Sequence, residues 1–137
     1  ILTARARCVT GAGMGSENTS DPLILIVEDE DSIRLTLRDY LQKKGYRVVV
    51  ASEGVGAIKQ LLDNEVDFIV TDYRMDILGG DYWVRFLRRY CQEIPTIITS
   101  GFLQPEVKIP FPVLYKPYDY AELEARIRAE CLSDGAS

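Results

Sequence analysis

The sequence predicts an α/β fold in which a doubly wound, five-stranded parallel sheet is covered by helices on both faces. Two observations predict it. From residue 23 onward, short apolar runs alternate with segments of helical periodicity, and the apolar runs are continuous instead of alternating with polar residues. A continuous run is typical of a strand buried on both faces, as in parallel sheets. Ligands bind such folds at the carboxyl ends of the strands, where the strand order reverses.

The five predicted strands cover residues 23–27, 46–51, 67–71, 95–99 and 112–115. Apolar residues between and after these strands recur at the three- and four-residue spacing of a helix face. This spacing predicts helices over Ile33–Leu41, about 53–63, Trp83–Tyr90 and 119–132. Gly45 follows the first helix, where a glycine is a common stop signal. The elements thus alternate as a parallel sheet with helical crossovers requires.

The predicted domain covers residues 22–133, between an N-terminal tail over 1–21 and a C-terminal tail over 134–137. The N-terminal tail shows no sustained periodicity, so we expect it to be disordered. No apolar segment follows its two arginines, which argues against a secretory signal. Met14 within the tail is a candidate start, in which case the residues before it are an addition to the natural chain.

Composition excludes several classes of function. The net charge of −5, without a basic cluster, argues against nucleic acid as a partner, and no apolar run approaches the roughly 20 residues that span a bilayer. The three cysteines show no metal-binding spacing, so a reducing, cytoplasmic location is expected. The chain has no histidine, which excludes Ser-His-Asp catalysis, histidine-ligated metals and a phosphohistidine on this chain.

Polar side chains gather at the carboxyl ends of four predicted strands, and they are Glu28, Asp29, Asp72, Ser100, Gly101 and Lys116. Carboxylates so close together repel unless a cation lies among them, and Mg²⁺ prefers oxygen ligands. With Mg²⁺ bound, the lysine, the hydroxyl and a backbone N–H would hold a phosphoryl group. Each residue alone has an ordinary explanation, such as a solvated loop or a turn. Their joint placement at one edge of the sheet is what indicates a functional site.

Four segments resemble the receiver (REC) domain of two-component response regulators, and they are LILIVEDEDSIR, DFIVTDYRM with GGD, PTIITSG and YKPYDYAELEARIR. The resemblance implies a flavodoxin-like (CheY-like) sheet of order 2-1-3-4-5. It implies that Asp72 accepts a phosphoryl group from a sensor histidine kinase in a Mg²⁺-dependent reaction. The metal ligands would be Glu28, Asp29, Asp72 and the backbone carbonyl of Arg74. Ser100 would be the switch hydroxyl and Lys116 the phosphoryl partner, with a cis peptide bond before Pro117.

The sequence also departs from the family pattern. Glu28 stands for the common aspartate, Ser100 for threonine and Asp76 for proline, and Val113 occupies the position of the aromatic switch residue. Prolines between Ser100 and Lys116 leave room for about one helical turn, so we expect the fourth helix of the family to be absent or disordered. The glycine after the switch hydroxyl, Gly101, and the missing fourth helix resemble the atypical FATGUY receivers, which are often paired with HWE-type sensor histidine kinases.

The expected function is that of a monomeric, single-domain response regulator, a phosphoacceptor and not an enzyme. It would act as a switch through contacts with a downstream protein, or as a phosphate sink, without binding nucleic acid or membrane. The alternative is a HAD-type phosphohydrolase, because Asp29-x-Asp31 follows a strand. Turnover of a generic phosphate ester would favour that alternative.

Overall fold

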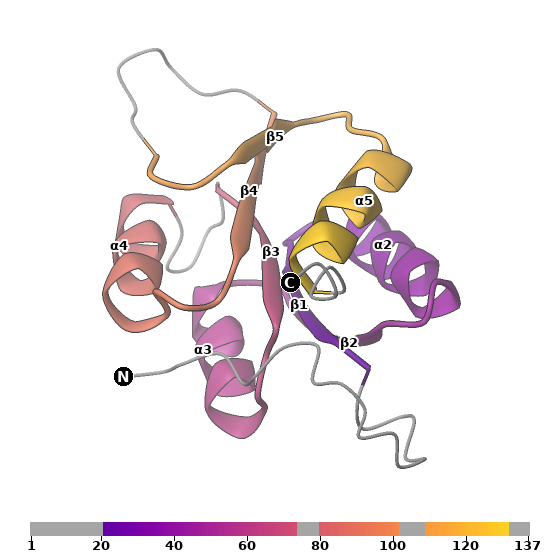
Figure 1. The fold of residues 1–137 in the computed structure, drawn as a ribbon. Helices are drawn as coiled ribbons and strands as arrows, with labels where there is room; N and C mark the ends of the chain where they lie inside the picture. The colour runs from indigo at the N-terminus through magenta and orange to yellow at the C-terminus, as the bar shows by residue number, and fades with distance from the viewer. Residues whose placement is uncertain (1–20, 74–79, 102–108, 132–137) are drawn as a thin grey trace.

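The computed structural model describes residues 21–73, 80–101 and 109–131, which form a parallel sheet between two layers of helices (Figure 1). The strands are β1 (Leu23–Val27), β2 (Arg47–Ala51), β3 (Phe68–Asp72), β4 (Thr96–Ser100) and β5 (Val113–Tyr115). All neighbouring strands are parallel and their order is β2-β1-β3-β4-β5, which confirms the predicted sheet.

The described helices are α2 (Asp31–Lys43), α3 (Gly54–Asp63), α4 (Gly80–Tyr90) and α5 (Tyr120–Cys131). α2 and α5 lie on one face of the sheet, and α3 and α4 lie on the other (Figure 1). Alternate residues of β1 enter the two cores: Ile24 and Ile26 pack toward α2 and α5, and Leu25 and Val27 pack toward α3 and α4. This double burial explains why the strand sequence is apolar throughout.

Four of the five strands begin one residue later than predicted, and in β4 and β5 the predicted first residue is a proline. Pro95 and Pro112 have no N–H to donate, so the regular strands start at Thr96 and Val113. Their carbonyls still accept hydrogen bonds of 2.9 Å from the N–H groups of Ile69 and Ile98. Gly45 follows α2 with a φ of 102°, a conformation that favours glycine and that accounts for the stop.

The expected loss of the family's fourth helix concerns the connection between β4 and β5. Residues 109–112 of this connection are not helical. Residues 102–108 lie outside the described part, as do the two expected tails apart from Asp21. None of the described helices is long and apolar enough to cross a membrane.

Candidate functional site

The register of the sheet places β1, β3 and β4 so that their carboxyl ends meet. Val27 pairs with Thr71, and Asp72 pairs with Thr99. The residues that directly follow β1 therefore lie beside the end of β3. Ser100 is the last residue of β4, one residue beyond the predicted end of that strand, and it lies at the same edge.

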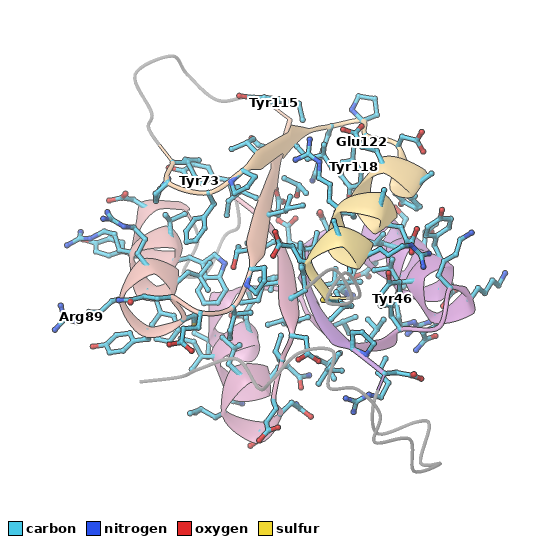
Figure 2. The ribbon with its side chains drawn as sticks, viewed as in Figure 1. Tyr46, Tyr73, Arg89, Tyr115, Tyr118 and Glu122 are labelled. Carbon is cyan, nitrogen blue, oxygen red and sulfur yellow. The ribbon has the colours of Figure 1, made fainter. Side chains whose placement is uncertain are left out.

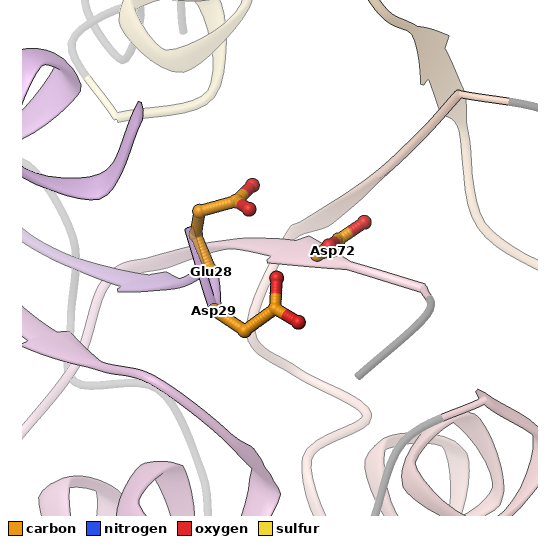
Figure 3. Close-up of side chains that lie close together, drawn as sticks. All are labelled: Glu28, Asp29 and Asp72. Carbon is orange, nitrogen blue, oxygen red and sulfur yellow. The ribbon is translucent and has the colours of Figure 1, made fainter. Parts of the chain in front are cut away.

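Glu28, Asp29 and Asp72 form an acidic cluster at this edge (Figure 3). Each contributes a carboxylate oxygen, and these oxygens all lie within 4.8 Å of one another. Glu28 and Asp72 are buried, with 4% and 6% of their surfaces exposed, whereas Asp29 is exposed. Two buried carboxylates this close to a third repel one another, so the arrangement is unfavourable without a cation.

Lys116, which directly follows β5, supplies one positive charge to the acidic cluster. Its Nζ lies 3.1 Å from Oε1 of Glu28 and 3.5 Å from Oδ2 of Asp72. The backbone N–H of Lys116 donates a 2.8 Å hydrogen bond to the carbonyl of Ser100, which ties the lysine to the end of β4. The peptide bond between Lys116 and Pro117 is cis. Counting only the residues that the structure describes, one ammonium among three carboxylates leaves two negative charges uncompensated when all are ionised.

This charge balance shifts the protonation of both partners. Burial and the charges of Glu28 and Asp29 raise the pKa of Asp72 to about 6, although Lys116 acts in the opposite direction. Burial alone would lower the pKa of Lys116, but its hydrogen bond to Glu28 and the charge of Asp72 raise it above the ordinary value. Lys116 is therefore an ammonium at neutral pH, and Asp72 is ionised at a cost.

The turn after β1 is held by groups that orient Glu28. The N–H of Glu30 donates a 3.1 Å hydrogen bond to Oε2 of Glu28, while Lys116 contacts the other carboxylate oxygen. Nη1 of Arg34 donates a 2.9 Å hydrogen bond to the carbonyl of Glu28. Sequence reasoning missed this role of Arg34. Its place in the first turn of α2, directly after the acidic run, was the available signal.

A second missed contact lies beneath Asp72. The indole Nε1 of Trp83 donates a 2.8 Å hydrogen bond to Oγ1 of Thr71, whose hydroxyl in turn donates to the carbonyl of Asp72 at 3.1 Å. Both Thr71 and Trp83 are fully buried. Buried indole N–H groups usually donate a hydrogen bond, so the position of Trp83 on the apolar face of the predicted helix indicated that it needs an acceptor. The contact ties α4 to the end of β3.

Of the remaining predicted residues, Ser100 and Gly101 lie at the same edge, Val113 lies within the sheet, and the others lie outside the described part. Ser100 is buried at 1% exposure, and Gly101 after it is exposed, with no heavy atom within 4 Å of the position a Cβ would take. Val113 is half-buried on β5, where it pairs with Ile98. Arg74 and Asp76 lie outside the described residues.

Asp31, on which the phosphohydrolase alternative depends, is not part of the acidic cluster. It is the first residue of α2, its side chain is 81% exposed, and it forms a 2.5 Å ion pair with Arg34. The cluster contains Asp72 instead. This geometry disfavours the HAD-type alternative.

The donor set of the acidic cluster suits a hard divalent cation. Within the described part of the chain, its donors are carboxylate oxygens, these carry more negative charge than Lys116 balances, and one of them, Asp29, is exposed to solvent. Mg²⁺ binds proteins through one or two carboxylates while keeping several waters. A divalent ion would remove the uncompensated charge that Lys116 leaves.

Comparisons with known proteins agree with this arrangement. The sequence model of the response regulator receiver domain matches residues 24–128. The transcriptional regulatory protein PrrA of Mycobacterium tuberculosis is 28% identical over 116 residues, which are 80% of this chain and 50% of PrrA. The sensor kinase CckA of Brucella abortus is 32% identical over 113 residues, which are 77% of this chain and 12% of CckA. The chain thus spans half the length of PrrA and a small part of CckA.

A solved structure agrees as well. The receiver domain of a Francisella response regulator superposes with a TM-score of 0.69 at 28% sequence identity. The superposition covers 79% of this chain and 94% of that domain.

Proposed function

The chain belongs to the response regulator receiver domain family, and from this premise we propose that it accepts a phosphoryl group on Asp72 in a Mg²⁺-dependent reaction. The observation that carries the proposal is the position of Asp72. Its carboxylate lies within 4.8 Å of those of Glu28 and Asp29 and 3.5 Å from the ammonium of Lys116, at the carboxyl edge of the sheet. Such an edge is where α/β folds of this type place their ligands.

The geometry supports a simple division of roles. Asp72 would attack the phosphorus of a phosphohistidine, so that a P–O bond forms while the P–N bond breaks and the imidazole leaves with the electron pair. Glu28, Asp29 and Asp72 would hold Mg²⁺, and the bound ion would neutralise charge on the transferring oxygens. Lys116 would contact the same oxygens once its ion pair with Asp72 opens. With a pKa of about 6, Asp72 is mostly ionised, and hence nucleophilic, at neutral pH.

Receiver domains of response regulators pair with sensor histidine kinases, and we propose such a kinase as the donor. We also propose that the chain belongs to the FATGUY subfamily and that its kinase is of the HWE type. The glycine after Ser100, the valine at position 113 and the non-helical residues 109–112 support them. We further propose that the backbone carbonyl of Arg74 is a metal ligand. The protein would be monomeric and located in the cytoplasm.

Phosphorylation by a small-molecule donor tests the proposed function directly. Wild-type protein incubated with acetyl phosphate and Mg²⁺ is expected to gain the mass of one phosphoryl group, with peptide mapping to Asp72. The same mixture with EDTA should show no gain, because the carboxylates then repel the incoming oxygens. Intact-mass spectrometry measures both. Multiple turnover of a generic phosphate ester, or equal labelling in chelator, would contradict the proposal.

Mg²⁺ binding should also stabilise the fold without any phosphoryl donor. A ligand that binds only the native state stabilises it by about 1.4 kcal/mol at ten times its Kd. Thermal unfolding should therefore shift upward with Mg²⁺ in the wild type and much less in Asp29→Asn. Asp39→Asn on α2 is the matched control, since Asp39 is an exposed aspartate outside the acidic cluster. An equal shift in both variants would exclude Asp29 as a ligand.

A further inference from the structure

A groove lies on the surface between α3 and α4, away from the acidic cluster. We call it the α3/α4 groove; its lining includes Ile58 of α3 and Tyr82, Arg85, Phe86, Arg88, Arg89 and Tyr90 of α4. Tyr82 is 69% exposed and Tyr90 is 39% exposed. Figure 2 shows Arg89 projecting from α4 away from the sheet. The groove thus combines aromatic rings with guanidinium groups.

The charge of the α3/α4 groove opposes that of the whole chain. The chain has a net charge of −5, yet three arginines lie within five residues of α4. Arg85 has a weak ion pair with Asp81 at 3.9 Å, and neither Arg88 nor Arg89 has an acidic partner among the described residues. Like charges three and four residues apart on a helix repel each other. An anionic partner would relieve this repulsion.

The helix dipole explains only part of this pattern. Arg88 and Arg89 lie in the last turn of α4, where a positive charge is favourable. Arg85 lies before that turn, and its side chain is 65% exposed. Stabilisation of the helix end also gives no reason for the exposed ring of Tyr82 at the start of α4.

The α3 side of the groove continues into an apolar stripe. Val55, Ile58 and Leu62 follow one another at three- and four-residue spacing, so they lie on one face of α3. Val55 is 46% exposed and Leu62 is 69% exposed. Contiguous exposed apolar surface with a charged rim is typical of protein interaction sites.

The floor of the groove is rigidly supported. Phe86 stacks on the buried Trp83 with ring centroids 5.6 Å apart and planes 13° apart, and Tyr90 lies 5.1 Å from Phe86. Trp83 is itself fixed by its hydrogen bond to Thr71. A preformed apolar floor loses little entropy when a partner binds.

We propose that the α3/α4 groove docks an acidic amphipathic helix of a partner protein. Apolar residues of that helix, spaced three and four apart, would pack on the α3 stripe and on the rings of Tyr82, Phe86 and Tyr90. Glutamates or aspartates beside them would pair with Arg85, Arg88 and Arg89. Charge complementarity favours this occupant over a basic helix, and the negative charge of the chain disfavours nucleic acid. The proposal does not depend on phosphoryl acceptance at Asp72.

Designed peptides test the docking site on the full chain. Two helical peptides share one leucine stripe, which is flanked by glutamates in one peptide and by lysines in the other. Fluorescence anisotropy of the labelled peptides gives their Kd, and amide chemical shifts locate the contact. The glutamate peptide should bind more tightly, with shifts concentrated on α3 and α4, and its affinity should fall as salt is added.

Charge reversal identifies the residues responsible. Arg88→Glu/Arg89→Glu should weaken binding of the glutamate peptide at least about tenfold. The control, Arg38→Glu/Arg126→Glu, changes the net charge equally on α2 and α5 and should bind like the wild type. Absence of binding at millimolar peptide, equal binding of the lysine peptide or equal weakening in the control would overturn the proposal. Tighter binding of single-stranded poly-dT with shifts at the same residues would also overturn it.

Discussion

Asp72→Asn is expected to abolish phosphoryl acceptance and, at the same time, to make the fold more stable at neutral pH. The loss follows because an amide is not a nucleophile for phosphorus. The gain follows because the folded protein holds the Asp72 carboxylate in a buried position beside Glu28 and Asp29, which raises its pKa from 3.8 to about 6. Asparagine has nearly the same shape and carries no charge.

The sign of the pH dependence follows from proton linkage. Below about pH 4, Asp72 is protonated in both states and its charge has no effect. Between about pH 4 and 6, the unfolded chain releases the proton while the folded chain keeps it, so the free energy of unfolding falls as the pH rises. Above this window the penalty is constant. The difference between the two pKa values corresponds to about 3 kcal/mol. Because the site opens to solvent at Asp29, we expect a gain of about 1–3 kcal/mol.

Urea unfolding in the presence of EDTA measures this gain. Asp72→Asn should exceed the wild type at pH 8 and match it at pH 4. Asp39→Asn, an exposed and peripheral change, should show no such pH-dependent difference. Lower stability of Asp72→Asn at pH 8, or an equal gain at both pH values, would contradict the charge repulsion argument.

The sheet could be predicted from the sequence because its strands are buried on both faces. Runs such as Leu23–Val27 have no other common structural explanation at that length, and helical periodicity between them fixes the crossovers. Strand starts were less predictable, since Pro95 and Pro112 can precede a strand or begin it. The backbone hydrogen bonds decide this, and they depend on the neighbouring strand.

The acidic cluster could be predicted because parallel strands deliver their next residues to one edge. Strand order is enough to bring Glu28, Asp29 and Asp72 together. The supports of the site could not be predicted in this way. The hydrogen bonds of Arg34 to the Glu28 carbonyl and of Trp83 to Thr71 depend on how the helices pack against the sheet. Residue spacing alone does not specify this packing. An arginine and a buried tryptophan are also common on helices that have no role at a functional site.

Lys116→Met is expected to reduce the rate of phosphoryl acceptance by about 10²–10³. The ammonium forms ion pairs with both Glu28 and Asp72, so it is placed to stabilise negative charge that develops on the transferring oxygens. Methionine keeps much of the length and the apolar stem but no charge. Loss of the ammonium also removes the interaction that opposes the upward shift in the pKa of Asp72. A smaller fraction of Asp72 is therefore ionised at pH 7.

Rates of labelling by acetyl phosphate at saturating Mg²⁺ test this role, with circular dichroism to verify folding of each variant. Lys44→Met is the matched control. Lys44 follows the C-terminal end of α2 and lies over the ring of Tyr40, whereas Glu28 and Asp29 of the acidic cluster precede the N-terminal end of this helix. Raising the pH from 7 to 9 should restore ionisation of Asp72 in Lys116→Met but recover only a small part of the rate. Full recovery at pH 9 would show that the lysine acts only by keeping Asp72 ionised. A rate near that of the wild type at pH 7 would show that the ammonium has no part in the transfer.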